Sequence, residues 1–220
     1  MEPARLQLSI ARARPDHAPF LARVILAASR SHLARGPFDF ALDLDDAALL
    51  AIIERMALGE LASNCHFSRF LVAEVEGWPV GALAAFDPAE EDLPPLSAAL
   101  EAACEALGYS SGRIARIMAR IHTLAAYFPP ADPGSWTIEW VGVDEAWRRR
   151  GICRQLLAAM LAEGVRRGCR LAQVSTYIGN DAAAAAYLDA GLVVSREHRA
   201  PQFAEVLGAP GLLIMRRSLP

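Results

Sequence analysis

The most unusual stretch of the chain is WRRRGICRQLLAAML, residues 147–161, in which three consecutive arginines precede a glycine. Apolar residues then recur at helical spacing from Ile152, so a helix is predicted to begin directly after the arginines. The first N–H groups of a helix have no partner within it, and the helix dipole favours anions there. Positive charge from Arg148–Arg150 therefore indicates an anionic ligand, and Gly151 would let that ligand approach the backbone closely. An oxyanion-rich group such as a pyrophosphate suits both features.

The arginine loop could also be a familiar type of phosphate-binding loop or a run of solvated surface charges. The sequence contains no GxxxxGK[ST] and the loop no GxGxxG, which excludes the familiar phosphate loops of NTPases and dinucleotide-binding proteins. The alternative is that Arg148–Arg150 are solvated loop charges, since short basic runs are common on surfaces. The formal net charge of −3 gives no general reason to expect nucleic acid or an anionic membrane as a partner. Any anion site must therefore be local.

The elements around the arginines predict a strand–helix–strand unit. Residues 136–143, WTIEWVGV, predict a strand before the loop, and the helix then runs from about Gly151 to Arg167. RLAQVSTY, 170–177, predicts the next strand. An alanine-rich helix at 181–190 follows, with Asn180 as its N-cap. Such a succession requires a parallel crossover.

The rest of the chain supplies further strands and helices. We expect a strand at 6–13, a helix from about Asp16, an irregular stretch at 33–43, a helix at 45–60, hairpin strands at 69–76 and 79–86 with a turn at Gly77-Trp78, helices at 97–107 and 110–128, and strands at 192–199 and 211–218. Hairpins need antiparallel pairing, so the sheet is predicted to be mixed in an α/β fold. Residues 87–135 are longer than a hairpin-to-strand link should be and predict a helical insert.

Two motifs, each behind a predicted strand, carry a resemblance to a known family. The first reads R-x-x-G-x-C over residues 148–153, and the second reads N-x-x-A-x-x-x-Y-x-x-x-G-L over residues 180–192. Together they resemble the Q/R-x-x-G-x-G/A and N-x-x-A-x-x-x-Y-x-x-x-G-F segments of the GNAT superfamily of acyl-CoA-dependent N-acyltransferases. Cys153 stands where Gly or Ala is usual, and Leu192 replaces Phe. Cysteine packs as a small hydrophobe, so we expect coenzyme binding to be tolerated.

The resemblance implies the fold and the co-substrate. It implies one GNAT-like domain over residues 1–220, with the helical insert at about 87–135. Its mixed, mostly antiparallel sheet would carry a central parallel pair splayed at the cofactor site and helices on both faces. Acetyl-CoA would be the co-substrate, and no metal is expected. The residues implied to bind coenzyme A, mostly through their backbones, are Val141, Val143, Arg148, Arg149, Arg150, Gly151, Ile152, Cys153, Arg154 and Asn180.

The resemblance also implies catalytic roles. Tyr187 matches the general acid that protonates the coenzyme thiolate; the alternative is a tyrosine that packs its helix on the sheet. A backbone N–H at Val141 would polarise the acyl carbonyl. Glu139 is the best candidate for the base, and the alternative for it is a structural ion pair. Strand alternation predicts Glu139, Val141 and Val143 on one face, unless a bulge intervenes.

We therefore expect an acetyltransferase that moves an acetyl group from acetyl-CoA to a primary amine by direct transfer in a ternary complex. The alternative is an acyl-CoA-binding sensor or interaction module without turnover. The acceptor is expected to be a small-molecule or peptide amine, with no nucleic acid or membrane as partner, and a homodimer remains open. Four cysteines without CxxC spacing and the absence of a secretory signal favour a cytoplasmic location. The stripe Arg113, Arg116 and Arg120 is more typical of an exposed helix face than of an acidic-acceptor site.

Overall fold

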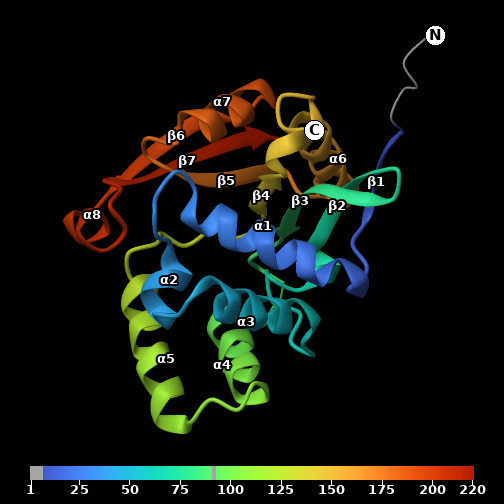
Figure 1. Cartoon of the computed structure of the whole chain (residues 1–220). Helices are drawn as coiled ribbons and strands as arrows, with labels where there is room; N and C mark the ends of the chain where they lie inside the picture. Colours follow the sequence, from blue (N-terminus) through green and yellow to red (C-terminus); the bar gives the residue numbers. More distant parts are fainter. Residues whose placement is uncertain (1–6, 91–92) are drawn as a thin grey trace.

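A seven-stranded mixed sheet forms the centre of the computed structural model, which describes residues 7–90 and 93–220 (Figure 1). Across the sheet the strands lie in the order β1-β2-β3-β4-β5-β7-β6. Their bounds are β1 Leu8–Arg12, β2 Phe70–Val75, β3 Trp78–Phe86, β4 Ser135–Val143, β5 Leu171–Tyr177, β6 Val193–Arg199 and β7 Gly211–Ser218. Every neighbouring pair is antiparallel except β4 and β5. The predicted mixed sheet with one central parallel pair is thus confirmed.

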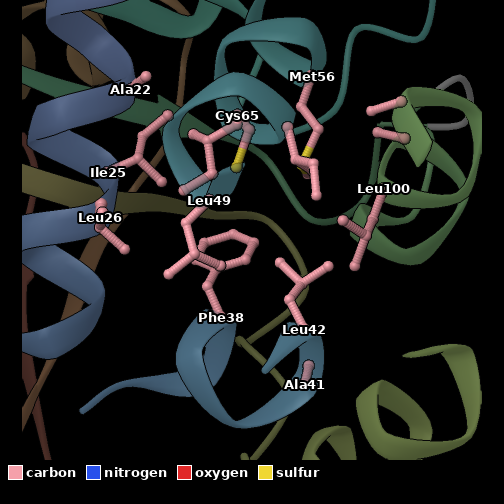
Figure 2. Close-up of a cluster of buried hydrophobic side chains, with 14 of the residues drawn as sticks. Ala22, Ile25, Leu26, Phe38, Ala41, Leu42, Leu49, Met56, Cys65 and Leu100 are labelled. Carbon is pink, nitrogen blue, oxygen red and sulfur yellow. The ribbon is translucent and has the colours of Figure 1, made fainter. Parts of the chain in front are cut away.

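Helices cover both faces of this sheet, each over its own apolar cluster. On one face lie α6 (Ile152–Arg166) and α7 (Asp181–Asp189). On the other face lie α1 (Ala18–Arg30), α2 (Pro37–Leu42), α3 (Asp46–Leu58), α4 (Leu96–Ala106), α5 (Ser111–Ala125) and α8 (Pro201–Leu207). Figure 2 shows how Ile25 of α1, Phe38 of α2 and Leu49 of α3 point toward one another in the second cluster. No helix in the described ranges is long and apolar enough to cross a membrane.

The prediction of an irregular stretch at 33–43 is wrong, because α2 lies within it. Its start is encoded locally: Pro37 stands at the first helical position, and the Asp39 carboxylate accepts the Gly36 N–H at 2.8 Å. Phe38 and Leu42 are buried against the other helices. A helix of six residues is too short to show periodicity, so only these end signals could have revealed it.

The hairpin turn is also shifted by one residue from its predicted place. Trp78 opens β3, and the turn falls on Glu76 and Gly77, which have φ values of 51° and 82°. Two successive residues with positive φ are typical of the tight turn that matches the twist of paired strands. Apart from α8, the other strands and helices lie where the sequence predicts them to within about three residues, with α4 and α5 inside the predicted insert.

The parallel pair at the centre of the sheet separates early. β4 pairs with β5 only from Ser135 to Ile138, opposite Leu171 to Val174. On its other side β4 is bulged against β3: the register shifts between Ala82 and Ala84, and Trp140 has φ 53°. A bulge adds a residue and increases local twist, which turns the strand away from its neighbour. The segment 139–143 therefore has no partner on β5 among the strand pairs described.

One close contact holds α6 against the paired half of β4. The indole N–H of the buried Trp136 donates to the Met160 carbonyl at 2.9 Å. A Cβ added at Gly164 would lie 2.7 Å from Cδ1 of Trp136, closer than real Cβ contacts allow. Gly164 is therefore required where α6 passes over the tryptophan.

The Gly164→Ala variant is expected to lower the free energy of unfolding by about 1–3 kcal/mol, since the tryptophan has no room to retreat. Gly112→Ala, in the first turn of α5 with nothing within 4 Å of the added Cβ, is the matched control and should be neutral or slightly stabilising. Urea unfolding of both variants measures the difference. Equal or greater stability for Gly164→Ala would contradict the packing described.

Candidate active site

The candidate site is the opening where β4 and β5 part. Before the opening, the β4 residues from Ser135 to Ile138 are buried; from Glu139 to Val143 they are all partly exposed. Unpaired main-chain groups along a strand edge can bind an extended ligand as an added strand would. The opening therefore combines solvent access with free backbone groups in the middle of the sheet.

At the mouth of the opening, α6 begins with an uncapped cluster of amides. Arg149 has φ 61° and Gly151 φ 76°, and Gly151 is the N-cap of α6 without a side-chain hydrogen bond. Helices α3 and α7 are capped by Asp45 and Asn180, whereas α1, α4, α5 and α8 also begin without a side-chain cap. Among the described residues, no main-chain carbonyl accepts the amides from Gly151 to Arg154. This arrangement forms a concave set of N–H groups suited to an anion.

The arginines before α6 differ in how they are held. Arg148 donates from Nε to the Val143 carbonyl at 3.1 Å, which ties the loop to the end of β4. The Arg150 guanidinium lies over the Trp147 ring, 4.7 Å from its centroid. Arg149 and Arg154 are exposed and form no ion pair within the described part of the chain. This role of Trp147 was not predicted from the sequence, although an aromatic residue beside a run of arginines is a signal for such stacking.

Tyr187 lies on the α6–α7 side of the opening. It is only 6% exposed and belongs to the same apolar cluster as the half-buried Cys153 on α6. Burial raises the pKa of the Tyr187 hydroxyl, and the nearby Cys153 thiol raises it further. The hydroxyl makes no hydrogen bond within residues 7–90 and 93–220, and its oxygen is not among the fully covered unpaired atoms there. The ring packs in the apolar cluster, as the alternative of a tyrosine that holds its helix on the sheet predicts.

Asn180 is confirmed as the N-cap of α7, because its Oδ1 accepts the Ala183 N–H at 3.1 Å. Its Nδ2 donates to Oγ of Ser31 at 2.6 Å. Ser31 ends α1 with φ 59°. The side chain thus joins α7 to the end of α1, a tie that the sequence did not reveal.

Glu139 lies on the opposite face of the sheet from Tyr187. The bulge at Trp140 breaks the alternation, so Val141 and Val143 pack toward α6 while Glu139 faces the helices of the other side. The prediction that these three residues share one face is therefore wrong, for the reason that the sequence left open. The carboxylate of Glu139 accepts a hydrogen bond from Asn64 Nδ2 at 2.6 Å.

Burial dominates the electrostatics of Glu139. It raises the pKa of this carboxyl from 4.5 to about 6, while the Asn64 hydrogen bond acts in the opposite direction. Among the described residues, no arginine or histidine forms an ion pair with Glu139, and its one side-chain hydrogen bond there comes from Asn64. A carboxylate with this pKa is ionised at neutral pH and still basic enough to accept a proton.

Asn64 is the functional candidate that sequence reasoning missed. It lies in the loop 59–66, which is held by local bonds: the Ser63 carbonyl accepts the His66 N–H at 3.0 Å, and the Arg69 guanidinium donates to the Ala62 carbonyl at 3.3 Å. These bonds bring the amide to Glu139, 75 residues away in the sequence. No motif surrounds Asn64, and only the tertiary structure could have identified it.

Other candidate groups lie away from the opening. The arginine stripe of α5 lines a cavity of about 280 Å³ together with Leu42 and Asp43, and none of the predicted site residues lines it. His122 is exposed on α5. All four cysteines are free thiols. Within the described residues, no group of three or more His, Cys, Asp or Glu side chains could hold a metal ion.

The sequence of this chain matches the model of a known protein family. The model of the acetyltransferase (GNAT) family matches residues 47–192. No curated protein sequence matches the chain. The match covers β2 through α7, and thus both the opening and the cradle before α6.

Solved structures with a similar fold share little sequence. A crystal structure of an acetyltransferase superposes with TM-score 0.69 at 17% identity, covering 96% of this chain and 100% of that one. An N-acetyltransferase from Staphylococcus aureus Mu50 gives 0.66 at 19% identity, with 95% and 100% covered. YncA from Salmonella typhimurium, solved with its cofactor acetyl-CoA, gives 0.53 at 17% identity, with 97% and 95% covered. At these identities the likeness establishes the fold alone.

The raised pKa of Glu139 predicts a pH-dependent gain in stability for the Glu139→Gln variant. The folded protein favours the protonated carboxyl, so the ionised form lowers stability above about pH 6, and this penalty disappears as the pH falls toward 4.5. Glutamine carries no charge and still accepts the Asn64 bond. The variant should be more stable by at most about 2 kcal/mol at pH 8, and not at pH 4.

Thermal and urea unfolding at both pH values measure the effect. Glu105→Gln on α4, where the carboxylate is exposed, is the control and should show no comparable gain. A Glu139→Gln protein less stable than the parent at pH 8 would contradict the description of Glu139 as a buried carboxylate without a cation.

Proposed function

This chain belongs to the acetyltransferase (GNAT) family, and we propose that it moves an acetyl group from acetyl-CoA to a primary amine by direct transfer in a ternary complex. The single observation that supports this most is the gap in the sheet between β4 and β5. Tyr187 lies on the α6–α7 side of that gap and Glu139 on the side of α1 to α5. A thioester that occupies the gap could be approached by an amine from one side and protonated from the other.

The cradle before α6 fits the pyrophosphate of the coenzyme. The amides from Gly151 through Ile152 and Cys153 to Arg154 are free of carbonyl partners among the described residues and would bind its oxygens. Arg149 and Arg154 would add charge, while Arg150 is oriented by Trp147. When bound, acetyl-CoA supplies an activated acyl group.

The neighbouring backbone would hold the rest of the coenzyme. The main-chain groups of Val141 and Val143 lie on the unpaired part of β4 and would bind the pantetheine arm as an added strand. The Val143 carbonyl already accepts a hydrogen bond from Arg148 Nε, so Arg148 and the pantetheine arm would both contact it. Asn180 would contact the coenzyme only through the amide hydrogen that is not donated to Ser31.

Transfer would proceed by attack of a neutral amine on the acyl carbon. Glu139, directly or through a water molecule, takes a proton from the ammonium so that the nitrogen lone pair becomes available. The backbone N–H of Val141 donates to the carbonyl oxygen as negative charge develops on it. When the carbon–sulfur bond breaks, Tyr187 gives its proton to the departing sulfur. A protonated thiol leaves more readily than a thiolate. The nitrogen then loses its second proton, which restores the Tyr187 hydroxyl through water, and Glu139 releases its proton to solvent. The acetylated amine and the free thiol are the products.

A sensor that binds the coenzyme without turnover would not need this arrangement. Its cradle alone would suffice, and neither the unpartnered hydroxyl of Tyr187 nor the raised pKa of Glu139 would have a use. Groups with perturbed pKa values cluster at catalytic sites, so their meeting at one gap favours the enzyme.

Replacement of Gly151 tests coenzyme binding. Gly151→Val is expected to raise the Kd for acetyl-CoA about 100-fold or more, because the side chain would point into the space above the free amides and strain a residue at φ 76°. Gly108→Val at the end of α4 is the matched control, since Gly108 has φ 77° and equally open surroundings. Calorimetric titration of both variants decides; unchanged affinity in Gly151→Val would remove the cradle from the proposal.

Removal of the Tyr187 hydroxyl tests the chemistry. Tyr187→Phe should lower kcat roughly 100-fold and leave the Kd for acetyl-CoA nearly unchanged, because only the proton donor is lost. Tyr109→Phe, near the start of α5, serves as the control and should behave as the parent. The measurement is coenzyme release in an amine-panel screen. Equal turnover in Tyr187→Phe and the parent would show that Tyr187 is not the acid.

A further inference from the structure

Two buried side-chain atoms without hydrogen-bond partners lie beside Glu139. Within the described part of the chain, Asn64 Oδ1 and Trp140 Nε1 are the buried side-chain N and O atoms that lack a partner. One is an acceptor and the other a donor. Buried polar atoms are normally paired, so each unpaired one requires an explanation.

The surroundings of Glu139 account for the position of both atoms. Glu139 can only accept, so the Asn64 amide must turn its Nδ2 toward the carboxylate, and Oδ1 is left without a donor. Trp140 follows Glu139 directly, and its positive φ brings the ring to the same side of the sheet. There it packs near Phe38 of α2, with the ring centroids 6.0 Å apart. Both residues therefore lie on the same side of the sheet as the Glu139 carboxylate.

We propose that the acceptor is an α-amino group next to a neutral carbonyl, as at a peptide N-terminus or in an amino acid amide. This inference rests on the proposed acetyl transfer. The amine would donate to Glu139 and to Asn64 Oδ1, and the adjacent carbonyl would accept from Trp140 Nε1. Such a compound carries both a donor and an acceptor, which are the two kinds of partner that Asn64 Oδ1 and Trp140 Nε1 lack.

The charge around the site favours a neutral carbonyl over a carboxylate. No cation of the described residues pairs with Glu139, and only burial and Asn64 affect the pKa of its carboxyl. A second carboxylate there would be repelled by Glu139 and would lose its water without compensation. A free amino acid should therefore be a poorer acceptor than its amide.

The basicity of Glu139 favours an α-amino group over a lysine-type amine. With a pKa of about 6, Glu139 takes a proton from an α-amino group, whose ordinary pKa is about 8, against an equilibrium of roughly 100-fold. For an alkylamine with a pKa of about 10.4 the corresponding factor is above about 10,000-fold. In the step itself, the ammonium N–H bond breaks, its electron pair stays on nitrogen, and the proton goes to the carboxylate.

Entry of the acceptor requires a local displacement, because both atoms are covered. The loop 59–66 carries Asn64, and its amide contacts β4 through the 2.6 Å bond to Glu139. An ammonium has three N–H groups and can take over that bond while also donating to Asn64 Oδ1. Movement of this loop away from Glu139 would provide that displacement.

The test compares acceptors built on one carbon skeleton. Phenylalaninamide, phenylalanylglycinamide, phenylalanine and phenethylamine differ in whether a carbonyl follows the amine, whether it is charged and whether it belongs to a peptide. With saturating acetyl-CoA, kcat/KM should be at least about 10-fold higher for the two amides than for the other two compounds. A rate confined to one of the two amides separates the small-molecule source from the peptide source.

Substitution of Trp140 isolates the carbonyl contact. Trp140→Phe keeps an aromatic ring and removes the N–H, so the ratio of kcat/KM between phenylalaninamide and phenethylamine should fall several-fold toward that set by amine basicity alone. Trp78→Phe is the matched control, since Trp78 is 75% exposed on β3, and should preserve the ratio. An unchanged ratio in Trp140→Phe, or equal use of all four compounds, would overturn the inference while leaving acetyl transfer intact.

Binding separates failure of the inference from failure of the proposed function. Calorimetric titration of the same four compounds into protein saturated with coenzyme A needs no turnover. Preference for the amides that weakens in Trp140→Phe supports the inference even if no acceptor is acetylated, which would count against the transferase. Equal binding or no binding of the four compounds overturns it.

Discussion

The early separation of β4 from β5 is the constraint on which the rest of this structure depends. A central strand in a sheet normally has its main-chain groups paired on both sides. Here the parallel pairing stops after Ile138, and of the next five residues of β4 only Glu139, Gly142 and Val143 are paired, all with β3. The bulge at Trp140 supplies the extra twist. A ligand can then lie within the sheet, so that groups on its two faces reach the same atoms.

The surrounding structure offsets the cost of this opening. Trp140 and Arg149 have positive φ, α6 starts without a side-chain cap, and the partly exposed Glu139 has no cation paired with it among the described residues. Each feature lowers stability, as strained and unpaired groups do at functional sites. The paired half of β4 is correspondingly well held: Trp136 is bonded to α6. Farther along α6, the buried Glu163 pairs with Arg12 of β1 and with Arg167.

The sequence could predict the regular elements because their signals are local. Alternation predicts β4 and β5, helical periodicity predicts α6, and Asn180 marks the start of α7 as its N-cap. It could not predict α2, which has too few residues for a period. Nor could it place Glu139 relative to Val141, since a bulge depends on how β3 and β4 are registered and leaves little trace in composition.

The two halves of the candidate site differ in how far they can be read from the sequence, and the reason is physical. The proposed coenzyme side consists largely of backbone amides, which need a glycine such as Gly151 at a fixed spacing in one continuous segment. Such spacing is visible in the sequence as a motif. The proposed acceptor side consists of side chains from distant segments, since Asn64 contacts Glu139 across 75 residues. Neither segment carries a sequence pattern that points to the other. A proposal about the acceptor can therefore come only from the tertiary structure, in which Asn64 and Trp140 each carry an unpaired buried polar atom.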